Sequence, residues 1–308
     1  MKLIHFLSYG IKKFKHDKKI NHEKIKNFKK EMANKDNQYG EYWKLNIESI
    51  FKKVKFKEEI LKYYGKDYKS NILEYTSYKQ KFVNKTNIEN GLFFWKKYKT
   101  ILKKSETPPE IIVSIIGIET KYGDFLGNYS IFNSLYTLAF NINDITGRST
   151  FFLNELKYFM NYCKKNKYIS NKKIFNLKGS FAGAMGLPQF MPSSIANYAV
   201  DGNKDNKIDL FTPEDAIKSV DNYLIKNKWN KKEEKIITKK DGGKALELNK
   251  YDYKDPNQCK DKFIILDNKK YFVSNNFCVL KKYNNSNFYA MAVYELAEKI
   301  KNKFQQEI

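Results

Sequence analysis

Apolar positions are densest between Pro108 and Gly123, and they predict a buried helix. Six isoleucine or valine residues fall within residues 111–118, with few polar residues between them. The proline pair at residues 108–109 suits the first helical positions, where the missing N–H would have no partner in any case. Gly123 is a natural stop, because glycine readily adopts the left-handed conformation that ends many helices.

One carboxylate interrupts this apolar segment. Glu119 follows Ile115 by four residues and Ile116 by three, which places the three side chains on one face of a helix. Burial there would raise the pKa of the carboxyl and keep it protonated near neutral pH, the state that a general acid needs. A helix-end carboxylate in a structural hydrogen bond is the alternative interpretation.

Helical periodicity recurs along most of the chain and predicts a mainly α fold (α+β). Residues 1 to about 70 are rich in lysine and show weak periodicity, and residues 126–140 fit a turn followed by a short helix. Stronger helical patterns cover residues 75–104, 149–166, 192–200, 213–228 and 287–304.

A small β region interrupts the helical patterns near the C-terminus. Residues 230–258 are polar, with a turn signal at 241–243. Two β-type runs, 262–266 and 271–274, flank residues 267–270 and predict a hairpin. We expect a third strand at residues 277–280.

Residues 178–194 combine small residues with polar side chains at fixed places. The segment holds three glycines and two prolines, together with Ser180, Gln189, Ser193 and Ser194. A plain core helix would not use this mixture. We interpret it as one wall of a cleft, with a helix of small residues lying beneath a bound chain.

An acidic loop at residues 201–215 has the spacing of a calcium site. The oxygen ligands Asp201, Asn203 and Asp205 occupy positions 1, 3 and 5, and the Lys207 carbonyl occupies position 7. Position 12, which normally holds a bidentate acid, is Thr212. A solvated acidic turn that caps the following helix is the alternative.

The net charge of +24 suggests a nucleic-acid-binding protein, but the type of basic residue argues against one. The chain holds a single arginine, Arg148, and its other basic residues are lysine apart from three histidines. A phosphate-binding surface normally uses arginine for bidentate contacts. We therefore expect no nucleic-acid partner.

The cysteines and the N-terminal residues do not identify the cellular compartment of the protein. Cys163, Cys259 and Cys278 form no even disulfide framework, and although Cys259 and Cys278 flank the predicted hairpin we expect free thiols. Residues 3–9 make a weak signal-like apolar run, and no cysteine follows that would carry a lipid. No apolar run reaches the roughly 18 residues of a membrane helix.

Several of these segments, in the same order along the chain, resemble the lytic murein transglycosylases of the B type, bacterial enzymes that cleave peptidoglycan. The resemblance covers roughly half of the chain. The matching pieces are residues 108–123, 179–194, 198–201, 219–223 and 283–293.

The resemblance implies a chemistry that fits the single anomalous carboxylate. Most glycosidases use two carboxylates, whereas these enzymes use one glutamate, at the position of Glu119. It protonates the bond between N-acetylmuramic acid and N-acetylglucosamine, and then deprotonates the muramic C6 hydroxyl, which closes a 1,6-anhydro ring. A hydrolytic muramidase and a non-catalytic peptidoglycan-binding protein of the same fold are the alternatives.

The resemblance also implies roles for residues outside the catalytic helix. Asp215 would supply the last ligand of a structural calcium ion, and no cofactor would be needed for catalysis. For the aromatic candidates and Met185, a core position is the alternative interpretation. The expected substrate-binding residues are Tyr78, Ser180, Met185, Gln189, Phe190, Tyr223, Tyr283, Asn284 and Tyr289.

The expected architecture is a lysozyme-like catalytic core with an added helical lobe and a small β appendage. Residues 1–74 would form a lysine-rich segment that is helical or partly flexible, 75–230 the core with the helical lobe and the calcium-type loop, 231–282 the appendage, and 283–308 a helix that completes the core. We expect a periplasmic, membrane-associated monomer that acts on glycan strands. Its high positive charge would aid retention on anionic wall polymers, and cell-wall synthesis proteins are the candidate protein partners.

Overall fold

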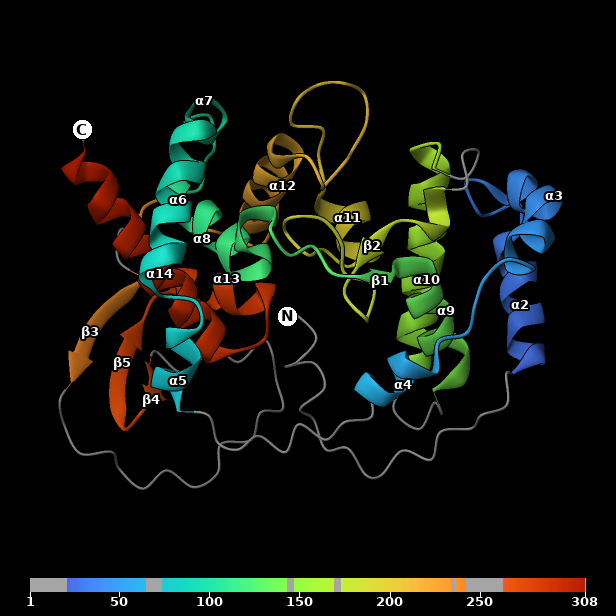
Figure 1. Ribbon diagram of the computed structural model, residues 1–308, viewed down its shortest axis with the longest axis horizontal. Helices are drawn as coiled ribbons and strands as arrows, with labels where there is room; N and C mark the ends of the chain where they lie inside the picture. The colour runs from blue at the N-terminus through green and yellow to red at the C-terminus, as the bar shows by residue number, and fades with distance from the viewer. Residues whose placement is uncertain are drawn as a thin grey trace. The chain divides into compact units, whose positions relative to one another are not determined.

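The computed structural model describes residues 21–64, 74–142, 147–168, 173–233, 236–241 and 263–307, and it confirms a mainly helical fold (Figure 1). The chain forms two compact units, each assembled from separate stretches of sequence. Within the described residues, unit 1 comprises 74–125 and 198–307, and unit 2 comprises 21–64 and 126–197. The expected N-terminal signal-like run and Cys259 lie outside the described residues.

Unit 1 is built around one central helix, α8 (Pro109–Thr120). It packs against α6, α12 and α14 (Figure 1), and every residue from Glu110 to Thr120 is buried. The helix is therefore buried on all faces, so lying on a buried face does not distinguish Glu119 from the other residues of the helix. The described helices of this unit are α5 (Tyr75–Gln80), α6 (Lys85–Lys97), α7 (Lys99–Leu102), α8, α12 (Pro213–Lys226), α13 (Asn275–Tyr283) and α14 (Asn287–Gln306).

Helix α8 ends three residues earlier than the sequence predicted. Lys121 and Tyr122 adopt positive φ angles of 51° and 63°, and a short 3-10 turn, η1 (Lys121–Gly123), follows the helix. The Tyr122 hydroxyl donates to the Asn87 carbonyl at 2.8 Å. Its ring covers Gly117 so closely that a Cβ there would lie 2.5 Å from the ring. This contact explains why a glycine occupies the middle of an otherwise bulky helix.

The β region of unit 1 is a three-stranded antiparallel sheet in the order β3–β5–β4 (Figure 1). Its strands are β3 (Ile237–Asp241), β4 (Phe263–Leu266) and β5 (Lys269–Val273). The predicted hairpin is confirmed, with a two-residue turn in which Asp267 and Asn268 have φ angles of 46° and 60°. Positive φ at both positions is the geometry of a type I′ hairpin turn.

The predicted strand at residues 277–280 is wrong, because this stretch lies in helix α13. The Ser274 side chain accepts the Asn276 N–H and caps the helix, while Phe277 and Leu280, three residues apart, are buried on one face. The third strand is β3 instead.

Unit 2 holds two long packed helices, α9 (Ile131–Asn141) and α10 (Arg148–Lys165). Helix α9 is buried along its whole length. The short strands β1 (Tyr129–Ser130) and β2 (Lys178–Gly179) pair in antiparallel fashion beside it. The remaining elements are α2 (His22–Met32), α3 (Gly40–Phe51), α4 (Glu58–Tyr64), η2 (Lys173–Phe175) and α11 (Pro192–Tyr198), which ends at the boundary of the unit.

The predicted helix of small residues within 178–194 is also wrong. Residues 180–191 form no helix and fold as a compact loop instead, held by bridges between Gly179 and Met185 and between Met185 and Phe190. A Cβ at Gly179 would lie 2.1 Å from the Ala184 carbonyl oxygen. A glycine is therefore required at this position, because a side chain would prevent the close backbone contact within the loop.

The expectation of free thiols holds for Cys163 but is wrong for Cys278. Cys163 is buried and free, whereas Cys278 is disulfide-bonded. An odd number of cysteines does not prevent one pair from forming. In the described part of the chain, none of the helices is both long enough and apolar enough to cross a membrane.

Candidate active site

Glu119 lies in the last turn of α8 and is 6% exposed. The Tyr289 hydroxyl, from α14, donates a hydrogen bond to Glu119 Oε1 at 2.9 Å. The two residues are 170 positions apart in sequence, so the packing of α14 against α8 creates this contact. The structure thus connects the candidate acid with one of the predicted tyrosines.

Further tyrosines continue from Tyr289 as a row of ring contacts. Tyr289 and Tyr283 stack, with centroids 6.1 Å apart and an interplanar angle of 8°. Tyr223 meets Tyr283 edge-on at 4.8 Å, and its hydroxyl donates to the Lys282 carbonyl at 2.9 Å. Tyr198, which the sequence had not indicated as a site residue, meets Tyr223 at 4.7 Å.

The electrostatics link three predicted tyrosines to the acid. Burial, followed by the negative charge of Glu119, raises the pKa values of Tyr78, Tyr283 and Tyr289 well above the usual value. All three phenols therefore stay protonated at neutral pH. Tyr78, half-buried in α5, also contacts Phe288 at 5.7 Å between ring centroids. The candidate acid has neutral hydroxyl groups around it.

The other buried carboxylates of the described residues have cationic or backbone partners. Lysine ammonium groups lie 3.1 Å from Glu110 and 2.9 Å from Asp221. Backbone N–H groups donate to Glu155 at 2.8 Å and to Asp215 at 2.7 and 2.8 Å. Such partners stabilise a charged carboxylate in a fixed structural role.

Asn284 follows α13 and lies near the tyrosine row, next to Tyr283 in the chain. It is 6% exposed, and its Oδ1 atom has no hydrogen-bond partner among the described residues. Buried polar atoms are nearly always hydrogen-bonded. An oxygen that lacks a partner here is consistent with a group that bonds to a ligand.

Ser180 and Gln189 lie in unit 2, where both fix the loop that contains them. Ser180 and Ala184 exchange hydrogen bonds, with the Ala184 N–H donating to Ser180 Oγ at 3.0 Å. The Gln189 amide donates to the carbonyls of Gly186 and Leu126 at 2.9 and 3.2 Å. Gln189 is 3% exposed and Ser180 is half-buried. Their predicted contact with substrate stays a prediction.

Met185 and Phe190 occupy interior positions of the same unit. Both side chains are fully buried, and their backbone N–H and C=O groups bond to each other at 3.0 and 3.1 Å. This is the environment of a core residue, the alternative that the sequence left open. Their predicted part in the substrate wall stays a prediction.

Glu155 is a buried carboxylate that no sequence pattern had indicated as a site residue. It lies in α10 and accepts hydrogen bonds from the Ser193 N–H at 2.8 Å and the Ser193 hydroxyl at 2.6 Å. Burial outweighs these hydrogen bonds and raises the pKa of the Glu155 carboxyl. The contact fixes the start of α11 at the end of the 178–194 segment. Its sequence signal was a carboxylate next to apolar Leu156 and three residues after Phe152.

The acidic loop folds around its own carboxylates. Asp201 accepts the N–H groups of Lys204 and Asn206 at 2.6 and 2.8 Å, and Lys204 and Asn206 both have a φ of 65°. Asn203 accepts the Asp205 N–H at 3.0 Å. Asn206 therefore takes the left-handed conformation that glycine provides at position 6 of an EF-hand loop.

Asp215 closes this loop from the first turn of α12. It is 1% exposed, and its two carboxylate oxygens accept backbone N–H groups of Gly202, Asn203 and Asp209. Burial, with a smaller contribution from the negative charge of Asp201, raises the pKa of Asp215.

The oxygen donors of this loop fit calcium in type, but carboxylates alone do not make a site. No group of three or more Cys, His, Asp or Glu side chains in the described chain lies close enough to hold a metal. A calcium ion would therefore also need the Asn203 amide oxygen and the Lys207 carbonyl, both of which are hard oxygen ligands. Each carboxylate oxygen can accept a second bond beside its N–H contact.

Comparison with known proteins places this geometry in a family. The family model for the transglycosylase SLT domain matches residues 21–298. The chain is 35% identical over 255 residues to the membrane-bound lytic murein transglycosylase B of Escherichia coli strain K12. That match covers 72% of this chain and 66% of the relative, so the chain spans just under two thirds of the relative's length.

Solved structures extend the comparison to the fold. The Escherichia coli lytic transglycosylase Slt35, solved in complex with calcium, matches with a TM-score of 0.77 and 30% identity over 93% of this chain and 95% of its own. Soluble lytic transglycosylase SltB1 from Pseudomonas aeruginosa matches with a TM-score of 0.76 and 30% identity over 91% of this chain and 98% of its own. These matches confirm the mainly α, lysozyme-like fold class.

Proposed function

The chain belongs to the family of transglycosylases with an SLT domain, and from this membership we propose that it is a lytic murein transglycosylase that cleaves peptidoglycan. It cuts the β-1,4 bond between N-acetylmuramic acid and N-acetylglucosamine and leaves a 1,6-anhydromuramic end. The observation that carries the proposal is a buried glutamate, Glu119, that receives a phenol hydrogen bond within a row of tyrosines.

The first step is proton transfer from Glu119. The protonated carboxyl donates its proton to the oxygen of the glycosidic bond, and the bond from that oxygen to muramic C1 breaks. N-acetylglucosamine leaves with a hydroxyl group, and positive charge develops at C1. The N-acetyl group of the muramic sugar stabilises this charge, so a second carboxylate is not required.

The second step returns the proton to the same residue. Glu119, now a carboxylate, takes the proton of the muramic C6 hydroxyl, and the C6 oxygen bonds to C1. The anhydro ring closes without water, and Glu119 is again protonated. One group performs both steps because the acid of the first step is the base of the second.

The neighbouring residues position the acid and the sugar chain. Tyr289 fixes the Glu119 carboxyl by its hydrogen bond. The buried Asn284 Oδ1, which has no partner among the described residues, accepts a hydrogen bond from the sugar. Tyr78, Tyr223 and Tyr283 provide aromatic and hydroxyl contacts. Substrate contact by Ser180, Met185, Gln189 and Phe190 stays a prediction from the family resemblance.

The mass of the cleavage products distinguishes the proposed activity from the alternative functions. Purified sacculi are digested with the protein, and the soluble muropeptides are analysed by mass spectrometry. A transglycosylase gives muropeptides lighter by one water than the products of hydrolysis. Water-containing products would identify a hydrolytic muramidase. Sacculus binding without any product would identify a non-catalytic binding protein.

A structural calcium ion in the 201–215 loop is a second part of the proposal. The proposed ligands are the side chains of Asp201, Asn203, Asp205 and Asp215 with the Lys207 carbonyl, and Asp209 would bind through water. Because no three acidic side chains of the described residues already lie close enough to share a metal, the loop would have to tighten around the ion. The shape of the loop supports it, because Asp201 and Asp215 each accept backbone N–H groups of this loop and so hold its oxygen ligands in place. The Slt35 structure was also solved in complex with calcium. The ion would fix the start of α12 and take no part in the chemistry.

We further propose a location outside the cytoplasm, in the periplasm and associated with the membrane. The disulfide bond of Cys278 supports it, because such bonds persist in oxidising compartments. The monomeric state, the division at residues 74, 230 and 282, and contacts with cell-wall synthesis proteins remain predictions of this proposal.

A further inference from the structure

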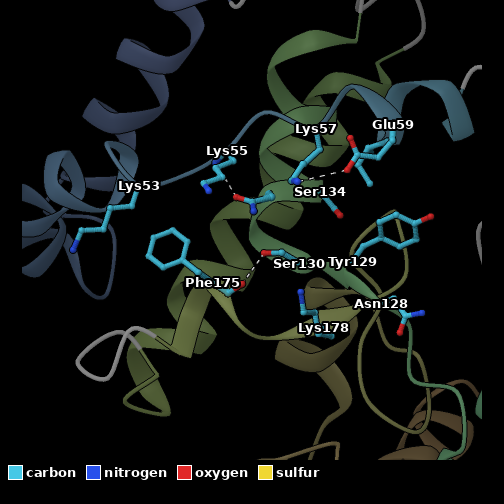
Figure 2. A pocket seen from close by; sticks show the side chains of 12 residues that line it. Lys53, Lys55, Lys57, Glu59, Asn128, Tyr129, Ser130, Ser134, Phe175 and Lys178 are labelled. Carbon is cyan, nitrogen blue, oxygen red and sulfur yellow. Dashed lines mark hydrogen bonds and ion pairs between the residues drawn. The ribbon is translucent and has the colours of Figure 1, made fainter.

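Unit 2 contains a pocket that the proposed chemistry does not use. Its volume is about 350 Å³, and its walls come from the segment between α3 and α4, the start of α4, β1, the start of α9, η2 and β2 (Figure 2). Four of the lining residues are lysines: Lys53, Lys55, Lys57 and Lys178. None of the catalytic candidates lines it.

The lysines converge because of the way the segment after α3 lies along α9. The Lys55 N–H donates to Asn133 Oδ1 at 2.9 Å, and the Lys57 N–H donates to Thr137 Oγ1 at 3.0 Å. Asn133 and Thr137 are one helical turn apart on α9. These two backbone hydrogen bonds hold the segment that carries Lys55 and Lys57 against α9.

The pocket carries a net positive charge. Glu59 is its acidic lining residue and lies 3.6 Å from Lys57 Nζ. One glutamate against four lysines leaves a net charge of +3 on the lining. Figure 2 shows Lys55 and Lys57 on one side of the pocket and Lys178 on the opposite side. Such an arrangement attracts an anion from both sides.

A buried hydroxyl at the base of the pocket also indicates a ligand. Ser134, in the first turns of α9, is 1% exposed, and its Oγ atom has no hydrogen-bond partner among the described residues. Figure 2 places this side chain in the pocket wall. Ser130, the N-cap residue of α9, makes no side-chain capping bond, although the Ile131 N–H already donates to the Leu177 carbonyl at 3.0 Å.

The size and lining of the pocket favour a peptide over a small inorganic anion. A single phosphate would fill only a small part of the pocket. The neutral groups of Asn128, Tyr129 and Ser134 beside the lysines suit amide and hydroxyl partners. We propose that this pocket binds the carboxylate-bearing peptide stems of peptidoglycan. This inference rests on the proposed function, because it assumes that peptidoglycan is the substrate.

Binding to the full chain tests the inference without any cleavage. The Glu119→Gln protein is titrated by calorimetry with a synthetic stem tetrapeptide that has free carboxylates, with the same peptide after amidation, and with inorganic phosphate. We expect the acidic peptide to bind, with an affinity that falls as salt rises. The amidated peptide and phosphate should bind about tenfold more weakly or not at all, since contacts to charged groups contribute most.

Matched variants locate the binding. Lys57→Gln and Lys178→Gln should each weaken binding of the acidic peptide about tenfold, whereas Lys52→Gln, an exposed lysine of the same segment outside the pocket lining, should leave binding unchanged. Ser134→Ala should weaken binding without lowering the melting temperature, because it removes a buried hydroxyl that lacks a partner.

Three outcomes would overturn the inference: equal binding by the pocket variants and Lys52→Gln, equal binding of the amidated peptide, or tighter binding of phosphate. None of them bears on whether the protein forms anhydro ends. A peptide-binding protein that yields no anhydro product would instead refute the proposed function alone.

Discussion

Tyr289 makes the contact that most directly defines the environment of Glu119. Its hydroxyl donates to the carboxylate, while its ring stacks on Tyr283. Because burial and the charge of Glu119 keep the Tyr289 phenol protonated, it remains a donor across the neutral pH range. We therefore regard Tyr289 as a residue that positions the acid.

Replacing Tyr289 by phenylalanine should distinguish a role in positioning the Glu119 carboxyl from a role in stabilising the fold. Tyr289→Phe keeps the ring and removes the hydrogen bond, so we expect kcat to fall about tenfold with little change in KM, and stability to fall by about 1 kcal/mol. Tyr122→Phe is the matched control, because it removes a buried phenol bond of 2.8 Å to a carbonyl. Equal kcat values in the two variants would contradict the positioning role of Tyr289.

At the scale of single residues, the sequence indicates the candidate acid Glu119 but not the side chains that contact it. Glu119 was identifiable because a carboxylate is rare within an apolar segment. Tyr289 is 170 residues away, and only the family resemblance indicated it. The sequence assigned no role to Glu155, or to Tyr198 in the matching piece 198–201, so their contacts with Ser193 and Tyr223 became evident only from the tertiary structure.

At the scale of elements, long periodic helices were predictable and irregular segments were not. The pattern at 287–304 matches α14 closely, because periodicity over many residues determines a helix. Residues 178–194 and 277–280 were assigned wrongly. In the first, backbone contacts at Gly179 favour a loop, and in the second, the Ser274 cap favours a helix over a strand.

The turn between β4 and β5 predicts a pH-dependent stability. Asp267 accepts the Tyr75 and Thr76 N–H groups at 2.6 and 2.8 Å at the start of α5. Burial opposes its charge, but the hydrogen bonds from Thr76 and Tyr75 outweigh burial and hold the pKa of Asp267 below its usual value. A lowered pKa in the folded state means that the contribution is present above the unfolded pKa and is lost as pH falls.

Asp267→Asn should therefore melt at a lower temperature than the wild type at pH 7, and the difference should shrink as pH falls below about 4, near the unfolded pKa of aspartate. Melting curves of both proteins across this pH range measure the difference in melting temperature. The same series on Asp36→Asn, an exposed acid of unit 2, is the control. A difference that stays constant or grows at low pH would contradict the assignment.

The 201–215 loop predicts a response to calcium. At a free calcium concentration about 100-fold above Kd, binding to the folded protein should raise the free energy of unfolding by roughly 2.7 kcal/mol. We expect calcium to raise Tm, a chelator to reverse the rise, and Asp201→Asn to remove it, whereas magnesium should have a smaller effect because it prefers water and strict octahedral geometry. Identical melting temperatures in calcium and chelator would refute calcium binding by this loop.

For the whole molecule, the two compact units are a feature that local patterns in the sequence do not indicate. Each unit combines stretches from distant parts of the chain, and residues 126–197 separate the two parts of unit 1. Periodicity and turn signals act over a few residues, so they cannot indicate such pairings. The family resemblance provided the global fold, and the solved relatives confirm its class.

The disulfide bond of Cys278 predicts sensitivity to reductant. Loss of a native disulfide typically costs about 2–4 kcal/mol, so dithiothreitol should lower Tm of the wild-type protein. Cys278→Ser is the matched control, because its Tm should be low already and should not change with reductant. The Cys163 thiol, buried and with a pKa raised by burial, should resist labelling in the folded state. A wild-type Tm unaffected by reductant would contradict a stabilising bond.

The rate of anhydromuropeptide release by Glu119→Gln, measured beside the wild type, tests the central claim most directly. Glutamine preserves the shape of the side chain and can still accept the Tyr289 hydrogen bond, but it cannot transfer the proton. General acid–base catalysis contributes about 10²–10⁴-fold, so we predict a rate loss of at least about 10³-fold for the two steps, with an unchanged melting temperature. A folded variant that releases anhydro products within tenfold of the wild-type rate would contradict the assignment of Glu119.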